Sequence, residues 1–228
     1  MLIKSVITRF SRTLRFGVQD HRSVFQHIYN TRYWGDRESV SGPGSSMLQT
    51  ANISEVLPRL IARNNFSSMF DAPCGDLHWM APIISSLDCK YSGGDIVPGV
   101  IDMAIRNSKL SGCEPDIKLF DIMTDDFPNV DVWMCRDVLF HFSFRNIRKT
   151  LDNFSRSSIK FILVTSHKEQ SVNNRNIATG DFRHLNLLKS PFKLRNENVV
   201  ERFDDYIFPS PPREMLLLRR DDFLKMLS

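Results

Sequence analysis

The sequence predicts an α/β protein in which helices cover both faces of a mostly parallel sheet. Short apolar runs alternate with helical stretches over residues 67–165, and two of these runs end in an aspartate. Such alternation implies parallel strands joined by right-handed crossovers. The chain has 228 residues, of which 42% are hydrophobic and 25% charged. This is ordinary globular usage and predicts one unit that buries a core without disulfide staples.

Two segments at the start of the chain, residues 1–16 and 20–31, are predicted to be helical. Residues 1–16 place apolar side chains at helical spacing with Lys and Arg between them. One interpretation is an interfacial helix that contacts a membrane surface or a partner. The interpretation we favour is an amphipathic helix on the protein's own core, because the segment lacks the cleavage site and long apolar centre of a signal peptide. Residues 20–31 are predicted to continue as helix.

The next segment, residues 33–46, is predicted to be a loop. Tyr33 and Trp34 precede a stretch in which two glycines and a proline fix a turn, and Ser46 is the predicted cap of a helix over residues 53–61. This segment is either a lid that folds over a ligand site or a plain linker. The two aromatic side chains favour a lid, because a linker does not need them. We therefore divide the chain into N-terminal helices with a lid, residues 1–50, and an α/β domain, residues 51–228.

Five strands and three helices are predicted in alternation after this helix. The strands lie near residues 67–72, 90–95, 116–120, 130–136 and 159–165, and the helices near 76–87, 98–110 and 143–155. Pro82 disagrees with the first of these helices, since an interior proline kinks or shortens a helix. Residues 168–196 are polar and are predicted to form a long excursion, which is usually functional in a compact domain. The last strands are expected near 199–203 and 214–219.

An acidic residue ends each of the first two predicted strands. The first strand leads into Asp71-Ala72-Pro73-Cys74-Gly75-Asp76, and the second ends at Asp95. The separation 95 − 71 = 24 is close to the roughly 20 positions between a phosphate-type turn and a ribose-binding acid in a βαβ unit. The spacing predicts an adenosine-containing cofactor.

The residues of the turn narrow the choice of cofactor. There is one glycine, Gly75, where dinucleotide folds need three, and no phosphate-binding loop is present. Asp71 and Asp76 put negative charge where a phosphate needs positive potential. Carboxylates suit a cofactor that carries a positive charge and ribose hydroxyls. S-adenosylmethionine has both and no phosphate.

The same residues resemble the motifs of class I S-adenosylmethionine-dependent methyltransferases. Residues 71–76 are similar to their first motif, with Pro-Cys in place of the usual Gly-rich pair, and residues 131–142, DVWMCRDVLFHF, resemble their fourth strand and the following loop. Together with Trp-Gly and Ser-Gly-Pro-Gly-Ser upstream, the D-x-P-C-G-D turn is similar to that of a bacterial subgroup. The resemblance implies a Rossmann-like, doubly wound sheet of seven strands, methyl transfer, and plausibly sugar acceptors in surface-polysaccharide assembly.

Cofactor-binding roles follow from the strand ends, where ligands of open α/β sheets bind. Asp71 and Gly75 are expected to frame the methionine part, and Asp95 to accept from the ribose hydroxyls. Asp76 is assigned equally to the cofactor or to the N-cap of the next helix. Asp121 is expected to accept from the adenine amino group. The full predicted set is Tyr33, Trp34, Ser45, Asp71, Pro73, Cys74, Gly75, Asp76, Trp79, Asp95, Ile96, Asp121, Ile122 and Arg136.

Three residues are candidates for the chemistry. His141 and His167 end the fourth and fifth strand regions, and a histidine titrates near working pH, so either is a candidate base for a hydroxyl acceptor. Asp137, beside Arg136, is the third. The structural alternatives are a packed His141 between phenylalanines, a solvated His167, and a surface salt bridge between Arg136 and Asp137.

The acceptor is expected to bind the excursion at residues 168–196. Arg183, His184 and Asn186 are the candidate contacts, with ordinary surface residues as the alternative. A basic and polar loop suits an anionic or sugar-like acceptor, so we expect a small molecule or a glycan. The oligomeric state is not predicted.

Composition and charge exclude several classes of protein. The net charge of +4 comes from interleaved residues, which argues against a nucleic-acid binder, and no apolar run approaches the 18 or so residues of a membrane span. Four cysteines without a C-x-x-C pair predict free thiols in a reducing, cytoplasmic compartment and no metal site. Two rival functions stay open: a non-catalytic S-adenosylmethionine-binding regulatory or scaffold module, and a nicotinamide-dependent oxidoreductase, which the missing glycines disfavour.

Overall fold

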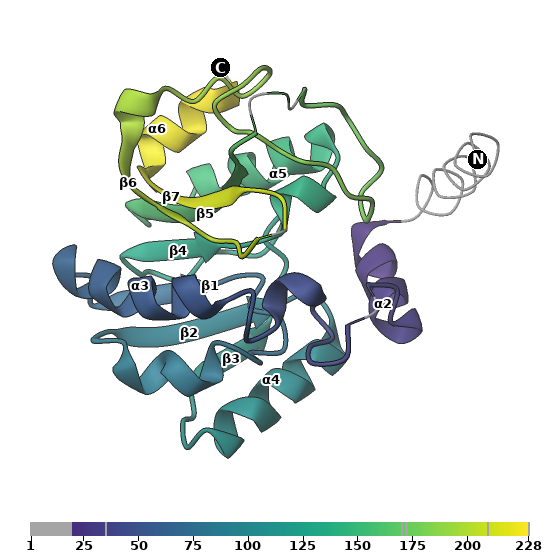
Figure 1. Ribbon diagram of the computed structural model, residues 1–228, viewed down its shortest axis with the longest axis vertical. Coiled ribbons are helices and arrows are strands. Elements are labelled where there is room, and N and C mark those ends of the chain that lie inside the picture. The colour runs from purple at the N-terminus through teal and green to yellow at the C-terminus, as the bar shows by residue number, and fades with distance from the viewer. Residues whose placement is uncertain (1–19, 35, 170, 172, 209, 228) are drawn as a thin grey trace.

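The computed structural model describes residues 20–34, 36–169, 171, 173–208 and 210–227. These residues form a seven-stranded sheet of order β3-β2-β1-β4-β5-β7-β6 (Figure 1). Strands β1 to β5 pair in parallel, and β7 runs antiparallel to β5 and β6. The predicted mostly parallel α/β sheet and its seven strands are confirmed. The strand bounds are β1 Ser68–Asp71, β2 Lys90–Asp95, β3 Asp116–Leu119, β4 Val132–Cys135, β5 Phe161–His167, β6 Val199–Asp204 and β7 Arg213–Arg219.

The described helices agree with most of the predicted ones. They are α2 His21–Thr31, α3 Ala51–Arg63, α4 Pro98–Leu110, α5 Phe144–Ser155 and the short α6 Arg220–Leu224. Asp20 and Ser143 cap α2 and α5, because each side chain accepts a hydrogen bond from the backbone N–H three residues later. The helix predicted over residues 1–16 lies outside the described residues.

The predicted cap Ser46 is wrong. Helix α3 begins four residues later than that cap requires, with Thr50 in the N-cap position. The hydroxyl of Ser46 instead accepts a 3.4 Å hydrogen bond from the N–H of Gln49, within the turn that precedes the helix. Serine hydroxyls stabilise such turns as readily as helix ends, so the residue type alone does not distinguish them.

The helix predicted over residues 76–87 is also wrong. The chain makes turns after Asp76 and then only a 3₁₀ segment, Ala81–Ser86. Leu77 has a positive φ of 55°, which a regular helix does not allow, and Pro82 lies in the first turn of the 3₁₀ segment. Proline is tolerated in a first turn, but it would lie in the interior of a helix that began at residue 76 and would break it there.

Successive side chains of the central strands point to opposite faces of the sheet and build two cores. On one face Phe70, Trp133 and Ile162 pack in a cluster with residues of α5 and α6. On the other face Met69, Met134 and Leu163 pack with residues of α3 and α4. Helices therefore cover both faces of the sheet, as Figure 1 shows for α3 and α5.

The helices on the two faces of the sheet leave the carboxyl ends of the parallel strands available for a ligand site. Figure 1 shows α2 beside the sheet instead of over either of its faces. Within residues 168–195, the described part forms no helix or strand, as expected for a long excursion. No helix in the described ranges is long and apolar enough to span a membrane.

Candidate functional site

A cavity lies at the carboxyl ends of β1, β2 and β4, and we call it the strand-end cavity. Its volume is about 110 Å³. Three groups of residues line it: strand-end residues, residues of α2, and residues of the loop after α2. They are His21, Phe25, Ile28, Tyr29, Trp34, Val40, Ser41, Ser45, Asp71, Pro73, Cys74, Gly75, Trp79, Asp95, Ile96, Val97, Val100, Phe120, Asp121, Ile122, Met134, Arg136, Asp137, Val138, His141 and Phe142. Twelve of the fourteen predicted cofactor residues are among them; Tyr33 and Asp76 are not.

Asp71 brings an incompletely satisfied carboxylate to this cavity. It ends β1, is 2% exposed, and accepts a 2.7 Å hydrogen bond at Oδ2 from the hydroxyl of Tyr91. Its other oxygen, Oδ1, is buried and has no hydrogen-bond partner. Burial raises the pKa of Asp71 to about 7. A buried acceptor without a donor is costly, and a cationic ligand in the cavity would satisfy it.

Asp95 lies across the same cavity at the end of β2. Its Oδ2 accepts from the N–H of Gly75 at 3.2 Å, and its Oδ1 from the N–H of Val97 at 3.1 Å. Gly75 has a φ of +61°, and a side chain there would collide with the hydroxyl of Ser41. Burial raises the pKa of Asp95 to about 6. The turn after β1 thus fixes the carboxylate at the end of β2.

Asp121 lines the cavity, but its carboxylate is already paired. Its Oδ2 accepts from Nε2 of His21 at 2.7 Å and lies 2.9 Å from a guanidinium nitrogen of Arg22. Its Oδ1 accepts from the N–H of Met123 at 2.9 Å. Burial raises the pKa of Asp121, but the hydrogen bond from His21 holds it below its ordinary value. Asp121 therefore anchors α2, and its predicted contact with an adenine amino group stays a prediction, because the residue still lines the cavity.

Asp76 does not line the strand-end cavity and is not an N-cap. Its carboxylate accepts from the hydroxyl of Ser39 at 2.9 Å and from the N–H of Val40 at 2.9 Å. The N–H of His78 also donates to it, at 3.2 Å. Both predicted roles are corrected, because this buried carboxylate holds the loop before α3 against the turn after β1. The loop then places Val40, Ser41 and Ser45 in the cavity wall.

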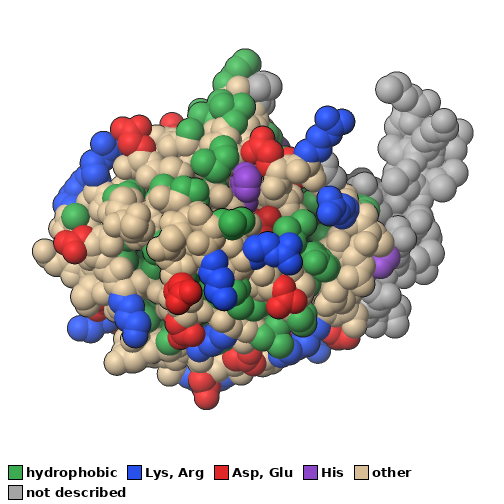
Figure 2. Space-filling model, turned by 90° about the horizontal axis from the view of Figure 1, so that it is seen from below, with side chains coloured by type: hydrophobic (Ala, Val, Ile, Leu, Met, Phe, Trp, Pro, Cys, Tyr) green, Lys and Arg blue, Asp and Glu red, His purple; other side chains and the backbone are tan. Residues whose placement is uncertain are grey.

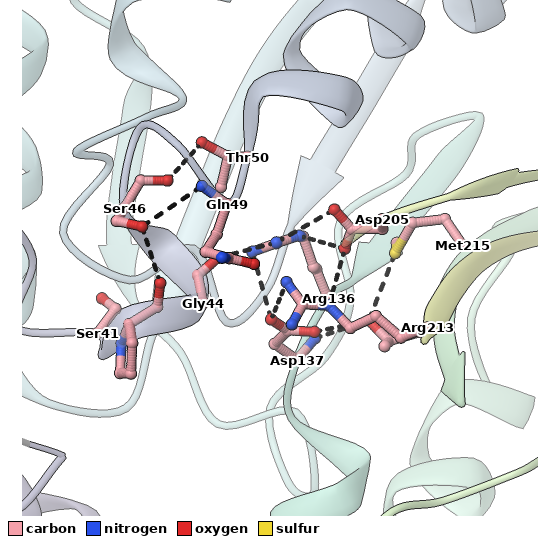
Figure 3. Close-up of polar contacts among 12 residues, drawn as sticks. Ser41, Gly44, Ser46, Gln49, Thr50, Arg136, Asp137, Asp205, Arg213 and Met215 are labelled. Carbon is pink, nitrogen blue, oxygen red and sulfur yellow. Dashed lines mark hydrogen bonds and ion pairs between the residues drawn. The ribbon is translucent and has the colours of Figure 1, made fainter. Parts of the chain in front are cut away.

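Arg136 and Asp137 belong to a buried charge network and not to a surface salt bridge. Arg136 donates to Asp205 from Nε at 2.9 Å and from Nη2 at 3.2 Å, and also from Nη2 to the carbonyl of Gly44 at 2.9 Å. Arg213 lies 3.4 Å from Asp137 and 3.5 Å from Asp205. Figure 3 shows Gly44, Arg136 and Asp205 joined by hydrogen bonds, with Asp137 and Arg213 beside them. The network joins the ends of β4 and β6 and the start of β7 to the loop.

A second cavity adjoins the first, and we call it the aromatic cavity. Its volume is about 400 Å³, within the usual range of about 300–1,000 Å³ for small-ligand pockets. It is lined by Tyr33, Trp34, Ser41, Gly42, Pro43, Gly44, Gln49, Asp137, Phe140, His141, Gly180, Asp181, Phe182, Ser210, Pro211 and Arg213. Four residues line both cavities: Trp34, Ser41, Asp137 and His141. Tyr33, predicted for the cofactor, belongs to this second cavity.

His141 has the chemistry of a base at this junction. Its Nδ1 lies 2.9 Å from the carbonyl oxygen of Asp181, and a carbonyl only accepts, so Nδ1 carries the proton. The neutral ring then has its lone pair on Nε2. Burial lowers the pKa of His141 to about 4, which keeps the ring neutral at neutral pH. The ring also packs on Phe140, with centroids 4.6 Å apart, so the packing interpretation is met in part.

His167 is brought to neither cavity. It is buried, and its Nδ1 accepts a 3.2 Å hydrogen bond from the N–H of Leu185. Its ring stacks on His184 with centroids 4.7 Å apart. Both the predicted base and the solvated alternative are corrected, because the strand end that carries His167 is covered by the excursion.

The three predicted acceptor contacts also lie outside both cavities. Arg183 is buried and donates to the carbonyl oxygens of Phe142 and Leu139, so it holds the turn that carries His141. Nδ1 of His184 pairs with Glu169 at 2.5 Å. Asn186 is buried and accepts from the N–H of Leu188 at 2.9 Å. The excursion does reach the aromatic cavity, but through residues 180–182.

Sequence reasoning missed two groups of residues. Four side chains of α2 line the strand-end cavity, namely His21, Phe25, Ile28 and Tyr29. The apolar spacing of residues 20–31 predicts a helix, but it does not indicate that this helix lines a cavity. Asp205 and Arg213 in the buried network gave no signal, because their partners are 69 and 76 positions away in the sequence.

The part of the chain that the structure describes shows neither a cluster of metal ligands nor a basic stripe on the face in Figure 2. Among the described residues no three His, Cys, Asp or Glu side chains gather as metal ligands, and the four cysteines are free. Figure 2 shows basic and acidic side chains interspersed over the face in view, without a basic stripe.

Comparisons with known proteins agree with this architecture. No protein-family model and no curated protein matches the sequence. A magnesium protoporphyrin IX methyltransferase from Synechocystis PCC 6803 with bound SAH has a TM-score of 0.61 and 14% identity, covering 88% of this chain and 100% of that chain. An S-adenosylmethionine-dependent methyltransferase from Leishmania major has a TM-score of 0.64 and 15% identity, covering 91% and 89%.

A third solved structure extends the comparison. The N-methyltransferase NodS from Bradyrhizobium japonicum WM9 has a TM-score of 0.54 and 15% identity, covering 75% of this chain and 96% of that chain. Identities of this size show a shared fold, and function has to be argued from the site. The chain has the Rossmann-like fold of the class I S-adenosylmethionine-dependent methyltransferases.

Proposed function

We propose that this protein is an S-adenosylmethionine-dependent methyltransferase whose cofactor binds the strand-end cavity. The observation that carries the proposal is the pair Asp71 and Asp95, two buried carboxylates at adjacent strand ends. The unpartnered Oδ1 of Asp71 suits the ammonium of the methionine part. Asp95 suits the ribose hydroxyls, since a carboxylate accepts from both. Ile96 and Ile122 supply apolar surface for the adenine.

The first cavity has to enlarge to admit this cofactor. Its volume of about 110 Å³ is below the roughly 300 Å³ at which small-ligand pockets begin. Helix α2 and the loop at residues 39–46 form the movable wall in this proposal. The division at residue 50 is part of this proposal: the described part of residues 1–50 serves as the lid, and residues 51–228 as the catalytic domain.

The aromatic cavity is the proposed site of the methyl acceptor, a small molecule or glycan that reacts through an oxygen. Asp71 and Asp95 would hold S-adenosylmethionine, which would supply an electrophilic methyl group to the acceptor oxygen, with its sulfur keeping the electron pair of the C–S bond. His141 takes the hydroxyl proton at Nε2. The cavity walls orient the acceptor, and orientation supplies much of the acceleration. Asp137 helps to place the acceptor at the junction.

A non-catalytic S-adenosylmethionine-binding module needs neither a base nor an acceptor cavity. The neutral His141 at the junction of two cavities therefore favours the enzyme. An oxidoreductase that binds a nicotinamide dinucleotide is disfavoured, because the turn after β1 carries one glycine, Gly75, and Asp71 lies where a pyrophosphate would need positive potential.

Calorimetry tests the cofactor site. The protein is titrated with S-adenosylmethionine, S-adenosylhomocysteine and NAD. We expect binding of the first two and none of the third. Asp95→Ala should weaken cofactor binding roughly tenfold or more, because a buried carboxylate loses its ligand contacts. The matched control Asp88→Ala changes an exposed aspartate just before β2 and should leave affinity unchanged. Unchanged affinity in Asp95→Ala would reject the assignment.

A further inference from the structure

The aromatic cavity combines ring surfaces with polar groups. Trp34, Phe140, His141 and Phe182 give the rings, and Phe140 meets Phe182 edge to face with centroids 5.4 Å apart. Phe182 is 50% exposed at this cavity. Asp137 and Arg213 give the charged groups. Such a lining suits a ligand with a flat or ring-shaped apolar face and polar groups at its edge.

Arg213 has unused hydrogen-bonding capacity in this cavity. The residue is 8% exposed, and its Nη2 is buried without a hydrogen-bond partner. Its closest carboxylate oxygens lie 3.4 Å and 3.5 Å away, on Asp137 and Asp205. Arg136, by contrast, makes hydrogen bonds of 2.9, 2.9 and 3.2 Å. A ligand oxygen in the cavity would therefore accept a hydrogen bond from Nη2 of Arg213, whereas the donors of Arg136 are already used.

The charges around Arg213 indicate whether the ligand oxygen that it binds is charged or neutral. The guanidinium groups of Arg136 and Arg213 are balanced by the carboxylates of Asp137 and Asp205. A ligand carboxylate or phosphate would add an uncompensated negative charge to a buried and neutral network, which is costly. A hydroxyl adds no charge. It accepts from a guanidinium and donates to a carboxylate at the same time.

Asp137 and Arg213 together favour two adjacent hydroxyls. Oδ2 of Asp137 lies 3.4 Å from Nη2 of Arg213, so a donor and an acceptor are side by side. The other oxygen of Asp137 lies 3.2 Å from the hydroxyl of Thr165, which donates to it. Neighbouring hydroxyls on one ring match this arrangement, with the ring against the aromatic wall.

We propose that the aromatic cavity binds an uncharged ring that carries adjacent hydroxyls, with the hydroxyls at Arg213 and Asp137 and the ring against Phe182 and Trp34. The inference rests on the proposed function, because it makes this diol the methyl acceptor beside His141. It chooses the neutral diol over the anionic acceptor that the basic excursion had suggested. Two sources share this chemistry: a neutral sugar and a catechol.

Ligand-observed NMR on the full chain with S-adenosylhomocysteine tests this inference. The neutral probes are methyl α-D-mannopyranoside, methyl β-D-galactopyranoside and catechol. The charged partners are galacturonate and 3,4-dihydroxybenzoate. We expect at least one neutral diol to bind more tightly than its charged partner. A sugar or catechol arm that binds alone identifies the source.

Two phenylalanines give a matched pair of variants. Phe182→Ala should weaken binding of the neutral diol about fivefold, through loss of a ring contact. Phe208 is 87% exposed and outside both cavities, so Phe208→Ala should bind as the unchanged protein does. Arg213→Gln should weaken the diol as well. Both variants of the pair change exposed rings, so folding is retained.

Three results would overturn the inference: tighter binding of either charged partner, no binding of any neutral diol, or equal binding by Phe182→Ala and Phe208→Ala. The calorimetric titration with S-adenosylhomocysteine separates this failure from that of the proposed function. If the cofactor product binds and the diols do not, only the acceptor class is wrong. If the cofactor product does not bind, the proposed function itself fails.

Discussion

The rings of Trp34 and His141 stack with their centroids 4.9 Å apart and their planes inclined by 27°. Both residues line both cavities, so this pair forms the wall between the strand-end cavity and the aromatic cavity. Trp34 comes from the loop after α2 and His141 from the 3₁₀ turn after β4. Trp34 of the proposed lid and His141, the proposed base, are therefore held together by one contact at the junction of the two cavities.

Cofactor affinity should rise with pH between about 5.5 and 7.5. Burial raises the pKa of Asp71 to about 7 and that of Asp95 to about 6, so both carboxyls hold protons in the folded protein below those values. A cationic ligand needs them ionised. Binding of S-adenosylmethionine should strengthen by up to about tenfold per pH unit for each of the two carboxyls in this window. Calorimetry over the range measures it, and Asp71→Asn should flatten the profile near its upper end.

The same two carboxyls make stability depend on pH in the opposite direction. Because their pKa values are raised on folding, their favourable contribution is complete below the ordinary value of 3.8 and is lost as pH rises to about 7. Urea unfolding of the cofactor-free protein should give a smaller free energy of unfolding at pH 7.5 than at pH 5.5. This decrease should be larger in the unchanged chain than in the double variant Asp71→Asn, Asp95→Asn. An equal change in both proteins would contradict the burial of these groups.

His141→Asn should lower kcat by about 10² to 10⁴ while cofactor affinity changes little, since a base acts in the transition state. Burial lowers the pKa of His141 to about 4, so the ring stays competent above pH 5 and gives no acid limb near neutrality. Methyl transfer is measured with labelled S-adenosylmethionine and the acceptor that the diol titration selects. His184→Asn is the control, because His184 lies outside both cavities. Equal kcat values for the two variants would remove His141 from the mechanism.

Asp76→Asn should loosen the loop before α3. The change removes the negative charge that accepts from Ser39 and Val40, at a cost of about 1–3 kcal/mol for buried hydrogen bonds. Because the loop supplies Ser41 and Ser45 to the strand-end cavity, cofactor binding should weaken several-fold and proteolytic cleavage within residues 39–46 should become faster. Asp102→Asn, an exposed change on α4, is the control. Cleavage at the control's rate would show that Asp76 does not hold the loop.

Arg136→Met should destabilise the protein by about 3–5 kcal/mol, because it leaves Asp205 buried without its main partner. The double variant Arg136→Met, Asp205→Leu removes both charges and should be more stable than the single variant. Urea unfolding measures the three proteins and gives their coupling free energy. Additive effects would mean that the two residues do not act as a pair.

Local patterns in the sequence predict the sheet well. Seven strands lie where apolar runs predict them, and α4 begins and ends where its periodicity does. The helix expected at residues 76–87 fails because Pro82 and the positive φ of Leu77 interrupt it. The cap at Ser46 fails because a hydroxyl serves a turn as readily as a helix end. These features depend on a few neighbouring residues, so a sequence pattern predicts them correctly or misplaces them by a few positions.

Side-chain roles divide differently. The placement of Asp71 and Asp95 at one cavity could be predicted from the sequence, because strand ends of a parallel sheet converge wherever the rest of the chain goes. Asp76 follows β1 and Asp121 follows β3, and each carboxylate pairs with a distant segment, the loop at Ser39 and the helix at His21. His141 and His167 also follow equivalent strands, and only the first reaches the cavities.

The sequence by itself determined the α/β sheet, the order of its elements and the two carboxylates at the strand ends, because each follows from local periodicity and the geometry of parallel strands. Only the tertiary structure decided which polar side chains are free for a ligand and which are used internally. The physical reason is that a buried polar group takes whatever partner the folded chain brings within hydrogen-bond distance, and partners such as Asp205 and Arg213 are fixed by long-range packing.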